Sequence, residues 1–165
     1  MQTFLPFATT DYTHVAKVLD NKRLNKQALE GWQILMTLLE LDPKGEHRKP
    51  KGWVNHPAVK MWKNSEIQLW QYIIAMTDEW KRRGFRTTID TKATETIRTA
   101  FENHLLEYAD AVPQWMLEAN KYRAIASSHR IALLAKDYDW YSQFGWIEDT
   151  GIAPDVYEYV WGENK

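Results

Sequence analysis

The sequence predicts an all-α protein: a single compact helical domain over residues 1–165 with an aromatic-rich irregular segment at its carboxyl end. Three observations support this fold class. Apolar residues recur every three or four positions in several long stretches, which is the period of an amphipathic helix. Pro and Gly stand near the places where such stretches begin and end. The chain is long enough for one substantial core, and no internal repeat or low-complexity linker marks a domain boundary.

The first half of the chain is expected to form three helices. A short helix covers about His14 to Leu19, and a long amphipathic helix follows from about Asn21 to Leu41. Residues 42–55 are polar and basic, and their Pro and Gly residues indicate a loop. Pro57 suits the first turn of the next helix, which is expected to continue to Arg83 with a bend near Asn64.

The second half continues the helical pattern. A further helix is expected from about Thr91 to Tyr108, and Pro113 begins an irregular passage that contains Trp115. The stretch "NKYRAIASSHRIALLAKD", residues 120–137, has the apolar spacing of another helix. The remaining aromatic and turn-rich residues are expected to wrap over the helices.

Composition limits the classes of protein and of site. There is no cysteine, so disulfides and thiolate metal sites are excluded, and the chain fits a reducing cytoplasm. No stretch resembles a secretory signal or a membrane span, so a cytoplasmic protein without a membrane partner is expected. Glycine-rich nucleotide motifs and a nucleophile elbow are missing, and the five histidines lack metal-ligand spacing. These features favour chemistry without a metal or another cofactor.

Charged and aromatic residues are unevenly distributed. Residues 1–63 contain ten Lys or Arg against six Asp or Glu, whereas the chain from Asp137 onward contains seven acids and one lysine. This asymmetry suggests a basic working face and an acidic tail, although chance clustering of solvated charges gives the same counts. Nine tryptophans and eight tyrosines exceed the needs of one core and indicate a groove or interface lined by rings.

A polar face of the long helix at 21–41 is the first candidate site. Arg23, Lys26, Gln27 and Glu30 gather there, opposite an apolar stripe. As an ordinary solvated face, it would include a Lys26–Glu30 pair that stabilises the helix by about 0.3 kcal/mol. As a functional site, Glu30 would stabilise a developing cation or move a proton, while Arg23 and Lys26 hold phosphate.

The second candidate is "GWVNHPAVKMW", residues 52–62. His56 lies at the expected start of a helix, where free N–H groups beside the basic loop attract an anion such as a backbone phosphate. Asn55 and His56 are therefore candidate DNA-binding residues, and Trp53 and Trp62 are suited to stack on bases. Alternatively, Asn55 and His56 cap the helix and the tryptophans belong to the core.

The third candidate is "SSHRIALLAKDYDWY", residues 127–141. Arg130 and Lys136 lie close in sequence to Trp140 and Tyr141, and this combination of cations and rings suits nucleic acid. His129 is a further candidate for DNA binding, but its position on an apolar stripe is also typical of a buried histidine with a satisfied hydrogen bond.

Several segments together resemble a known family: "MQTFLPF", "VLDNKRLNKQALEGWQIL", "GWVNHPAVKMW", "DEWKRRGF" and "SSHRIALLAKDYDWY…YVW". The chain is similar over nearly its whole length to small uncharacterised bacterial and phage proteins. These are grouped with the phage pyrimidine-dimer DNA glycosylases of the endonuclease V type. The similarity to the characterised glycosylases rests on the first long helix, the "E…KRRGF" helix end and the carboxyl-terminal "WY".

This resemblance implies an all-helical enzyme that removes one thymine of a cyclobutane dimer and then breaks the DNA strand. In the family, the α-amine of the first residue attacks the sugar C1′, and the resulting imine allows β-elimination. Glu30 resembles the helix glutamate that stabilises the cationic sugar. Arg23 stands near the place of a family histidine, and Trp140 and Tyr141 resemble aromatic residues that touch DNA.

The chain departs from the family pattern at two positions. Characterised relatives expose a small second residue after removal of methionine, whereas Gln2 is too large for efficient removal of Met1. The reacting amine would then belong to Met1, or to a lysine such as Lys22 or Lys26. Gln33 stands where the family has an arginine.

We expect a monomeric DNA glycosylase, with or without AP-lyase activity, that acts on damaged or modified pyrimidine bases in DNA. Two other classes stay open: a nucleic-acid-binding module without catalysis, and a protein-interaction factor such as a phage modulator of a host enzyme.

Overall fold

The computed structural model describes residues 1–106 and 111–162. In these residues it contains eight α-helices, one 3₁₀-helix and no β-strand, which confirms the predicted all-α fold. The helices are α1 Tyr12–Val18, α2 Asn21–Leu39, α3 Pro57–Lys60, α4 Glu66–Arg82, α5 Ile89–Glu102, α6 Gln114–Leu117, α7 Ala119–Lys136, α8 Tyr138–Tyr141 and the 3₁₀-helix η1 Ser142–Phe144. None of the helices in this part of the chain is long and apolar enough to cross a membrane.

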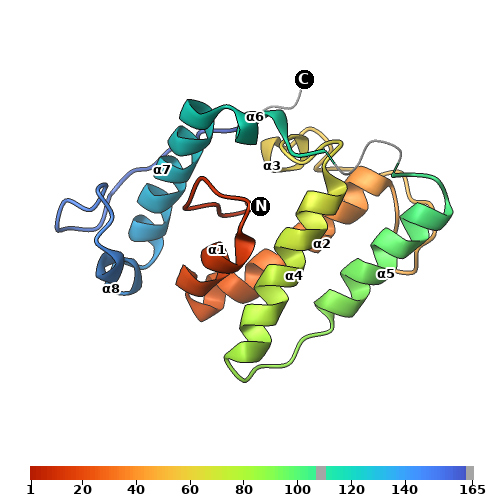
Figure 1. Ribbon diagram of the computed structural model, residues 1–165, viewed down its shortest axis with the longest axis horizontal. Helices are drawn as coiled ribbons and strands as arrows, with labels where there is room; N and C mark the ends of the chain where they lie inside the picture. Colours follow the sequence, from red (N-terminus) through yellow and green to blue (C-terminus); the bar gives the residue numbers. More distant parts are fainter. Residues whose placement is uncertain (107–110, 163–165) are drawn as a thin grey trace.

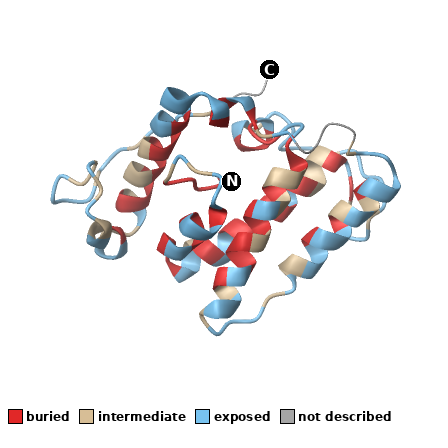
Figure 2. Cartoon of the chain, viewed as in Figure 1, coloured by how far each residue is buried: buried red, intermediate tan, exposed pale blue. Residues whose placement is uncertain are grey.

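Helices α2, α4 and α5 lie side by side, and α1 packs against α4 (Figure 1). Helix α7 lies on the other side of the molecule. The extended amino-terminal segment, which we define as residues 1–9, passes between α7 and the group formed by α1, α2 and α4 (Figure 1). Buried residues run along α2, α4 and α7 and through this segment (Figure 2). The start of the chain is therefore part of the core.

The apolar stripe of α2 faces α4, as its spacing predicts. Trp32 and Leu35 from this stripe are buried. Gly31 lies on the same side, and a Cβ atom there would be 2.7 Å from Cγ1 of Ile73 on α4. The missing side chain thus allows the two helices to approach closely.

The predicted single helix over residues 57–83 is wrong, because the chain breaks it into α3 and α4. Pro57 occupies the first turn of α3, as expected. The break comes at Asn64, whose φ of 62° lies in the left-handed region that Asn tolerates better than most residues. A bend was expected at this place, but a left-handed residue stops a helix instead of bending it.

The later elements follow the predicted order with two differences. Helix α5 ends at Glu102, earlier than expected, and the predicted end at Tyr108 lies outside the described residues. The passage around Trp115, predicted to be irregular, contains the short helix α6. Helix α7 matches its prediction closely.

Candidate active site

The amino-terminal segment is held by side chains, with no neighbouring strand. The backbone N–H of Gln2 donates to Oε2 of Glu30 at 3.1 Å. The N–H of Phe4 donates to Oε1 of Gln27 at 2.7 Å, and the N–H of Leu5 donates to Nδ1 of His129 at 2.8 Å. Each buried N–H left without a partner would cost about 1–3 kcal/mol. These bonds therefore hold the first residues of the chain at one position in the folded molecule.

Gln27 is therefore not part of a solvated face, as its place in the sequence suggested. Its side chain is 1% exposed, and Oε1 also accepts a hydrogen bond from the Tyr72 hydroxyl at 2.8 Å. The polar face of α2 is divided: Gln27 lies under the amino-terminal segment, and Lys26 reaches solvent. The helical spacing that groups the two residues does not reveal that another part of the chain covers one of them.

Glu30 lies at the edge between the core and solvent. Its side chain is 12% exposed, and Oε1 is 3.6 Å from Nζ of Lys26, which is 66% exposed. Its other oxygen accepts the Gln2 N–H described above, so the carboxylate stands one residue from the start of the chain. A carboxylate this close to the start of the chain can accept a proton from a group bound beside it and can stabilise positive charge there.

His56 adds a third polar group to this site. Its Nδ1 accepts a hydrogen bond from the Ala58 N–H at 3.1 Å, which caps α3. Partial burial lowers the pKa of His56, the positive amino terminus lowers it further, and Glu30 acts in the opposite direction. Since Nδ1 is an acceptor, the proton of the neutral ring is on Nε2. His56 thus offers a hydrogen-bond donor whose ring orientation is fixed by the cap.

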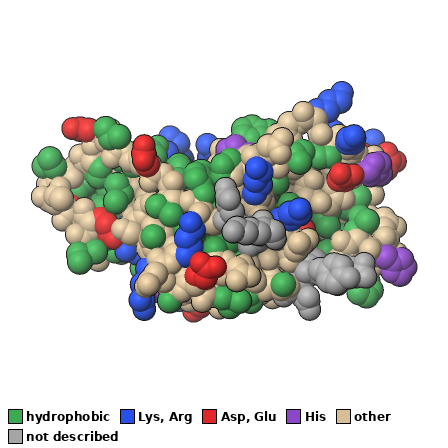
Figure 3. Space-filling view, turned by 90° about the horizontal axis from the view of Figure 1, so that it is seen from above, with side chains coloured by type: hydrophobic (Ala, Val, Ile, Leu, Met, Phe, Trp, Pro, Cys, Tyr) green, Lys and Arg blue, Asp and Glu red, His purple; other side chains and the backbone are tan. Residues whose placement is uncertain are grey.

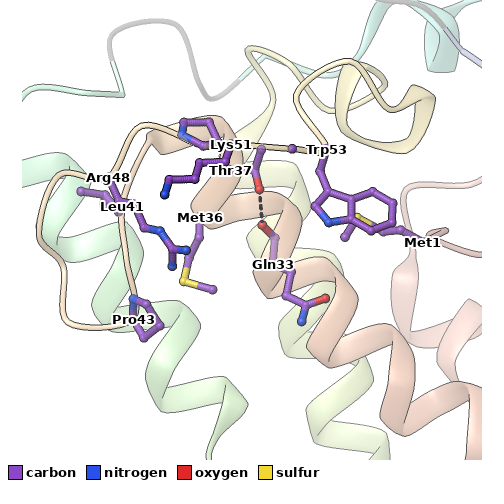
Figure 4. Close-up of a pocket in the computed structure, with 11 residues that line it drawn as sticks. Met1, Gln33, Met36, Thr37, Leu41, Pro43, Arg48, Lys51 and Trp53 are labelled. Atoms are coloured by element: carbon purple, nitrogen blue, oxygen red, sulfur yellow. Dashed lines mark hydrogen bonds between the residues drawn. The ribbon is translucent and has the colours of Figure 1, made fainter.

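A cavity of about 490 Å³ lies beside Met1. Figure 4 shows Trp53 next to Met1 on one side of the cavity, with Lys51 and Arg48 on the other side. The cations come from the loop between α2 and α3, which was predicted to be basic. An aromatic ring, two cations and the chain terminus around one cavity suit an anionic polymer with flat bases.

Arg23 is not brought to this site. It precedes Glu30 by two helical turns, or about 10 Å along the axis. Its guanidinium lies 3.3 Å from the carboxylate of Asp20 and 3.9 Å from that of Asp137, and it donates to the Lys136 carbonyl. Arg23 therefore joins α2 to the end of α7.

Two of the candidate DNA-binding residues are fully buried, which contradicts their expected contact with DNA. His129 receives the Leu5 N–H, and the hydroxyl of Tyr141 bonds to Asp20. The ring of Tyr141 also stacks on Trp146, with centroids 5.7 Å apart. The apolar stripe around His129 was compatible with burial, whereas the aromatic residues of the carboxyl-terminal region carried no signal that separates the core from the surface.

The other candidates from this region use their polar groups within the protein. Arg130 binds Glu148 through Nε at 2.8 Å and donates to the Pro6 carbonyl at 2.7 Å. Lys136 Nζ lies 3.0 Å from the Tyr157 hydroxyl, and the Trp140 indole N–H donates to the Val18 carbonyl. Helix α8, which carries Trp140, lies well apart from α3 in Figure 1, so Trp140 and His56 do not form one site.

Asn55 is exposed beside His56, in the loop that also provides Trp53. Among the described residues, no group of three or more His, Asp or Glu side chains is arranged to hold a metal ion. The residues that the structure brings together are thus Met1, Glu30, Lys26, His56 and the loop around Trp53.

The structure thus defines an all-α protein in which the second residue bonds to a helix glutamate, and in which a cavity lined by cations and a tryptophan lies beside the first residue. The comparison with family models makes this more specific. The model of the pyrimidine dimer DNA glycosylase family matches residues 1–93, and the chain belongs to that family. No curated protein and no solved structure matches the chain. The matched residues include Met1, Glu30 and His56.

Proposed function

We propose that this protein is a DNA glycosylase for damaged or modified pyrimidines, with AP-lyase activity supplied by the α-amine of Met1. The observation that carries the proposal is the hydrogen bond from the Gln2 N–H to Glu30, which joins the start of the chain to a carboxylate. Membership of the pyrimidine dimer DNA glycosylase family supports a DNA substrate.

In the proposed reaction, the Met1 nitrogen forms a bond to the sugar C1′, while the bond from C1′ to the base breaks. The base leaves with the electron pair and takes up a proton. The nitrogen gives up its protons as the sugar ring opens, and O4′ receives one of them. The resulting imine acidifies the hydrogen at C2′. Loss of that proton breaks the C3′–O bond and cuts the strand.

Glu30 is proposed to act in the first of these steps. Positive charge grows on the sugar as the base departs, so a nearby carboxylate stabilises the transition state more than the ground state. The same carboxylate is within reach of the backbone of Gln2, and so it is well placed to accept a proton from the neighbouring amine.

Lys26, Asn55 and His56 are proposed to bind the DNA backbone around the reacting nucleotide. Arg48 and Lys51 extend this positive surface around the cavity beside Met1. Because the reacting base must leave the stack, the cavity and its tryptophan offer a place for an extrahelical base. Arg130, Lys136 and Trp140 are left out of this proposal, since their polar groups already have partners inside the protein.

The decisive experiment replaces Glu30 by Gln, with Glu102→Gln on the exposed end of α5 as the matched control. A panel of duplexes that carry dimers or modified pyrimidines is scored for released base and for strand breaks. Glu30→Gln is expected to lower base release by at least about 100-fold, while binding to the same duplex is kept. Full base release by this variant would overturn the role of Glu30.

Borohydride trapping tests the amine. The wild-type protein is expected to become covalently linked to DNA, and peptide mapping of the product should place the link on Met1. Mass spectrometry of the purified protein checks that Met1 is retained. Trapping on Lys22 or Lys26 would overturn the assignment to Met1, and DNA binding without base release or trapping on any duplex would indicate a binding module.

A further inference from the structure

Four consecutive backbone N–H groups at the start of the chain donate to side-chain acceptors. Gln2 donates to Glu30, Phe4 to Gln27 and Leu5 to His129, at 2.7 to 3.1 Å, and the N–H of Thr3 donates to the Gln2 side chain itself. Extended backbone usually finds such partners in a neighbouring strand, where register can slip by a residue. Side-chain acceptors at defined positions allow one register.

The acceptors come from helices on both sides of the segment. Gln27 and Glu30 are three residues apart and share one face of α2. His129 belongs to α7, on the opposite side. Two carbonyls of the segment also have partners: the Tyr72 hydroxyl shares its single proton between Gln27 Oε1 and the Phe4 carbonyl, and Arg130 donates to the Pro6 carbonyl. The segment is thereby clamped between two helices.

His129 is suited to accept a hydrogen bond and little else. It is fully buried, and burial lowers its pKa to about 3, so the ring stays neutral at ordinary pH. The rings of Phe4 and Tyr159 meet it edge-on, with centroids 5.8 and 5.7 Å away. Its Nε2 has no hydrogen-bond partner among the described residues. Among the described residues, the hydrogen bond that the His129 ring makes is therefore the one from the Leu5 N–H to Nδ1.

We propose that Gln27 and His129 are positioning residues that set the register of the amino-terminal segment and keep the Gln2 N–H on Glu30, so that the Met1 amine starts one residue from that carboxylate. The proposal rests on the proposed function for its catalytic consequence, but the register itself does not. One residue of extended chain spans about 3.3 Å, so a slip by one position would break the Gln2–Glu30 hydrogen bond and displace the amine by about this distance.

The test compares two substitutions of His129. Asn places its side-chain oxygen close to the position of Nδ1 and keeps an acceptor for the Leu5 N–H, although it leaves a void. Leu fills more of the space but has no acceptor. The two variants therefore separate loss of packing from loss of the hydrogen bond. Gln27→Met has a similar side-chain volume but removes the acceptor for the Phe4 N–H. Like His129→Leu, it therefore tests the loss of a hydrogen-bond acceptor.

Two measurements are made on each protein. Hydrogen exchange of the Phe4 and Leu5 amides reports the register without any substrate, and exchange in His129→Leu is expected to be at least about 10-fold faster than in His129→Asn. Borohydride trapping on DNA with an abasic site reports the amine. His129→Leu and Gln27→Met should slow trapping by about 100-fold with little change in DNA affinity. His129→Asn should retain most of the wild-type trapping rate.

The outcomes separate the two proposals. Equal exchange and equal trapping in His129→Leu and His129→Asn would overturn the positioning role. Trapping that falls in proportion to the loss of thermal stability, in all three variants, would do the same, because a purely structural residue has that effect. A wild-type protein that never traps, but shows the expected exchange pattern, would overturn the proposed lyase activity and leave the register device in place.

Discussion

At the scale of single residues, the meaning of Glu30 depends on its partner. Its pairing with Lys26 is the one that a solvated helix face predicts, and it is compatible with no function at all. The bond to the Gln2 N–H spans 28 residues of sequence and has no such explanation. This contact supports the interpretation of the helix face as a catalytic site.

His56 provides a prediction at the same scale. His56→Asn keeps an N-cap acceptor for the Ala58 N–H and removes Nε2, whereas His56→Ala removes both. We expect Ala to lower the free energy of unfolding by about 1 kcal/mol and Asn to change it little. If the Nε2–H binds substrate, both variants lose strand cleavage. The control is His104→Asn, at an exposed left-handed residue.

The pH dependence of the His56 cap follows from its lowered pKa. Since the folded protein binds this proton less readily than the unfolded chain, the cap contributes stability above about pH 6.5 and loses it as the pH falls through the lower folded value. Denaturant unfolding between pH 7 and pH 5 should show a smaller decline for His56→Asn than for the wild type. An equal decline would show that His56 does not titrate in this way.

At the scale of elements, α2 has two tasks that its sequence interleaves. One face packs against α4, and the adjoining face supplies Gln27 and Glu30 to the amino-terminal segment. Gly31, directly after the catalytic candidate, lies where α2 meets Ile73 of α4. The same turn of α2 therefore meets α4 on one side and the amino-terminal segment on the other.

Gly31→Ala tests this contact. Helix propensity alone would stabilise the variant by about 1 kcal/mol, but the added Cβ would lie 2.7 Å from a fully buried isoleucine, and overpacking of that kind costs about 1–3 kcal/mol. We expect a net loss in the urea-unfolding free energy. Gly52→Ala, with open space around the new Cβ, is the control. The loss caused by Gly31→Ala should be smaller when it is measured in an Ile73→Ala background than in the wild type. An equal loss in both backgrounds would point to another cause.

At the scale of the whole molecule, the face seen in Figure 3 has mixed charge. The face in Figure 3 carries Lys and Arg side chains interspersed with Asp and Glu, and it shows no continuous basic patch. Positive charge near the candidate site comes from a few residues of α2 and the following loop. DNA binding by this protein should therefore depend on a small number of phosphate contacts.

Salt dependence measures these contacts. The slope of log affinity for duplex DNA against log salt changes by about 0.9 for each phosphate contact. Lys26→Ala and Lys51→Ala are each expected to reduce the slope by about this amount, because both side chains are exposed beside the site. Lys121→Ala, which changes an exposed residue of α7, should leave the slope unchanged. Equal slopes for all four proteins would place the DNA elsewhere on the surface.

The part of the chain beyond the family match also reaches the site. Tyr159 lies against Phe4, with ring centroids 6.3 Å apart, and Trp161 meets His56 edge-on at 5.9 Å. The irregular carboxyl-terminal segment, which was expected to wrap over the helices, thus also contacts the amino-terminal segment and the start of α3. The matched residues 1–93 contain Met1 and Glu30, and the remainder of the chain contains His129, Tyr159 and Trp161, which contact this part of the molecule.

Sequence reasoning succeeded where one stretch of chain determines the outcome. The bounds of α2 and α7, the position of Pro57 and the polar face around Glu30 follow from local periodicity. It failed where a distant segment decides. Gln27 looked like a surface residue, and His129 was assigned to DNA as one of two alternatives. Both are buried because the amino-terminal segment lies between their helices.

By itself, then, the sequence determined the helical class, the position of Pro57 at a helix start and the helix that carries the carboxylate, because these depend on backbone preference and side-chain spacing within a few turns. The tertiary structure alone decided that the Gln2 N–H donates to Glu30 and that the Leu5 N–H donates to His129, 124 residues away. Hydrogen bonds of this length in sequence have no local signature, since they form when packing brings two helices and one extended segment together.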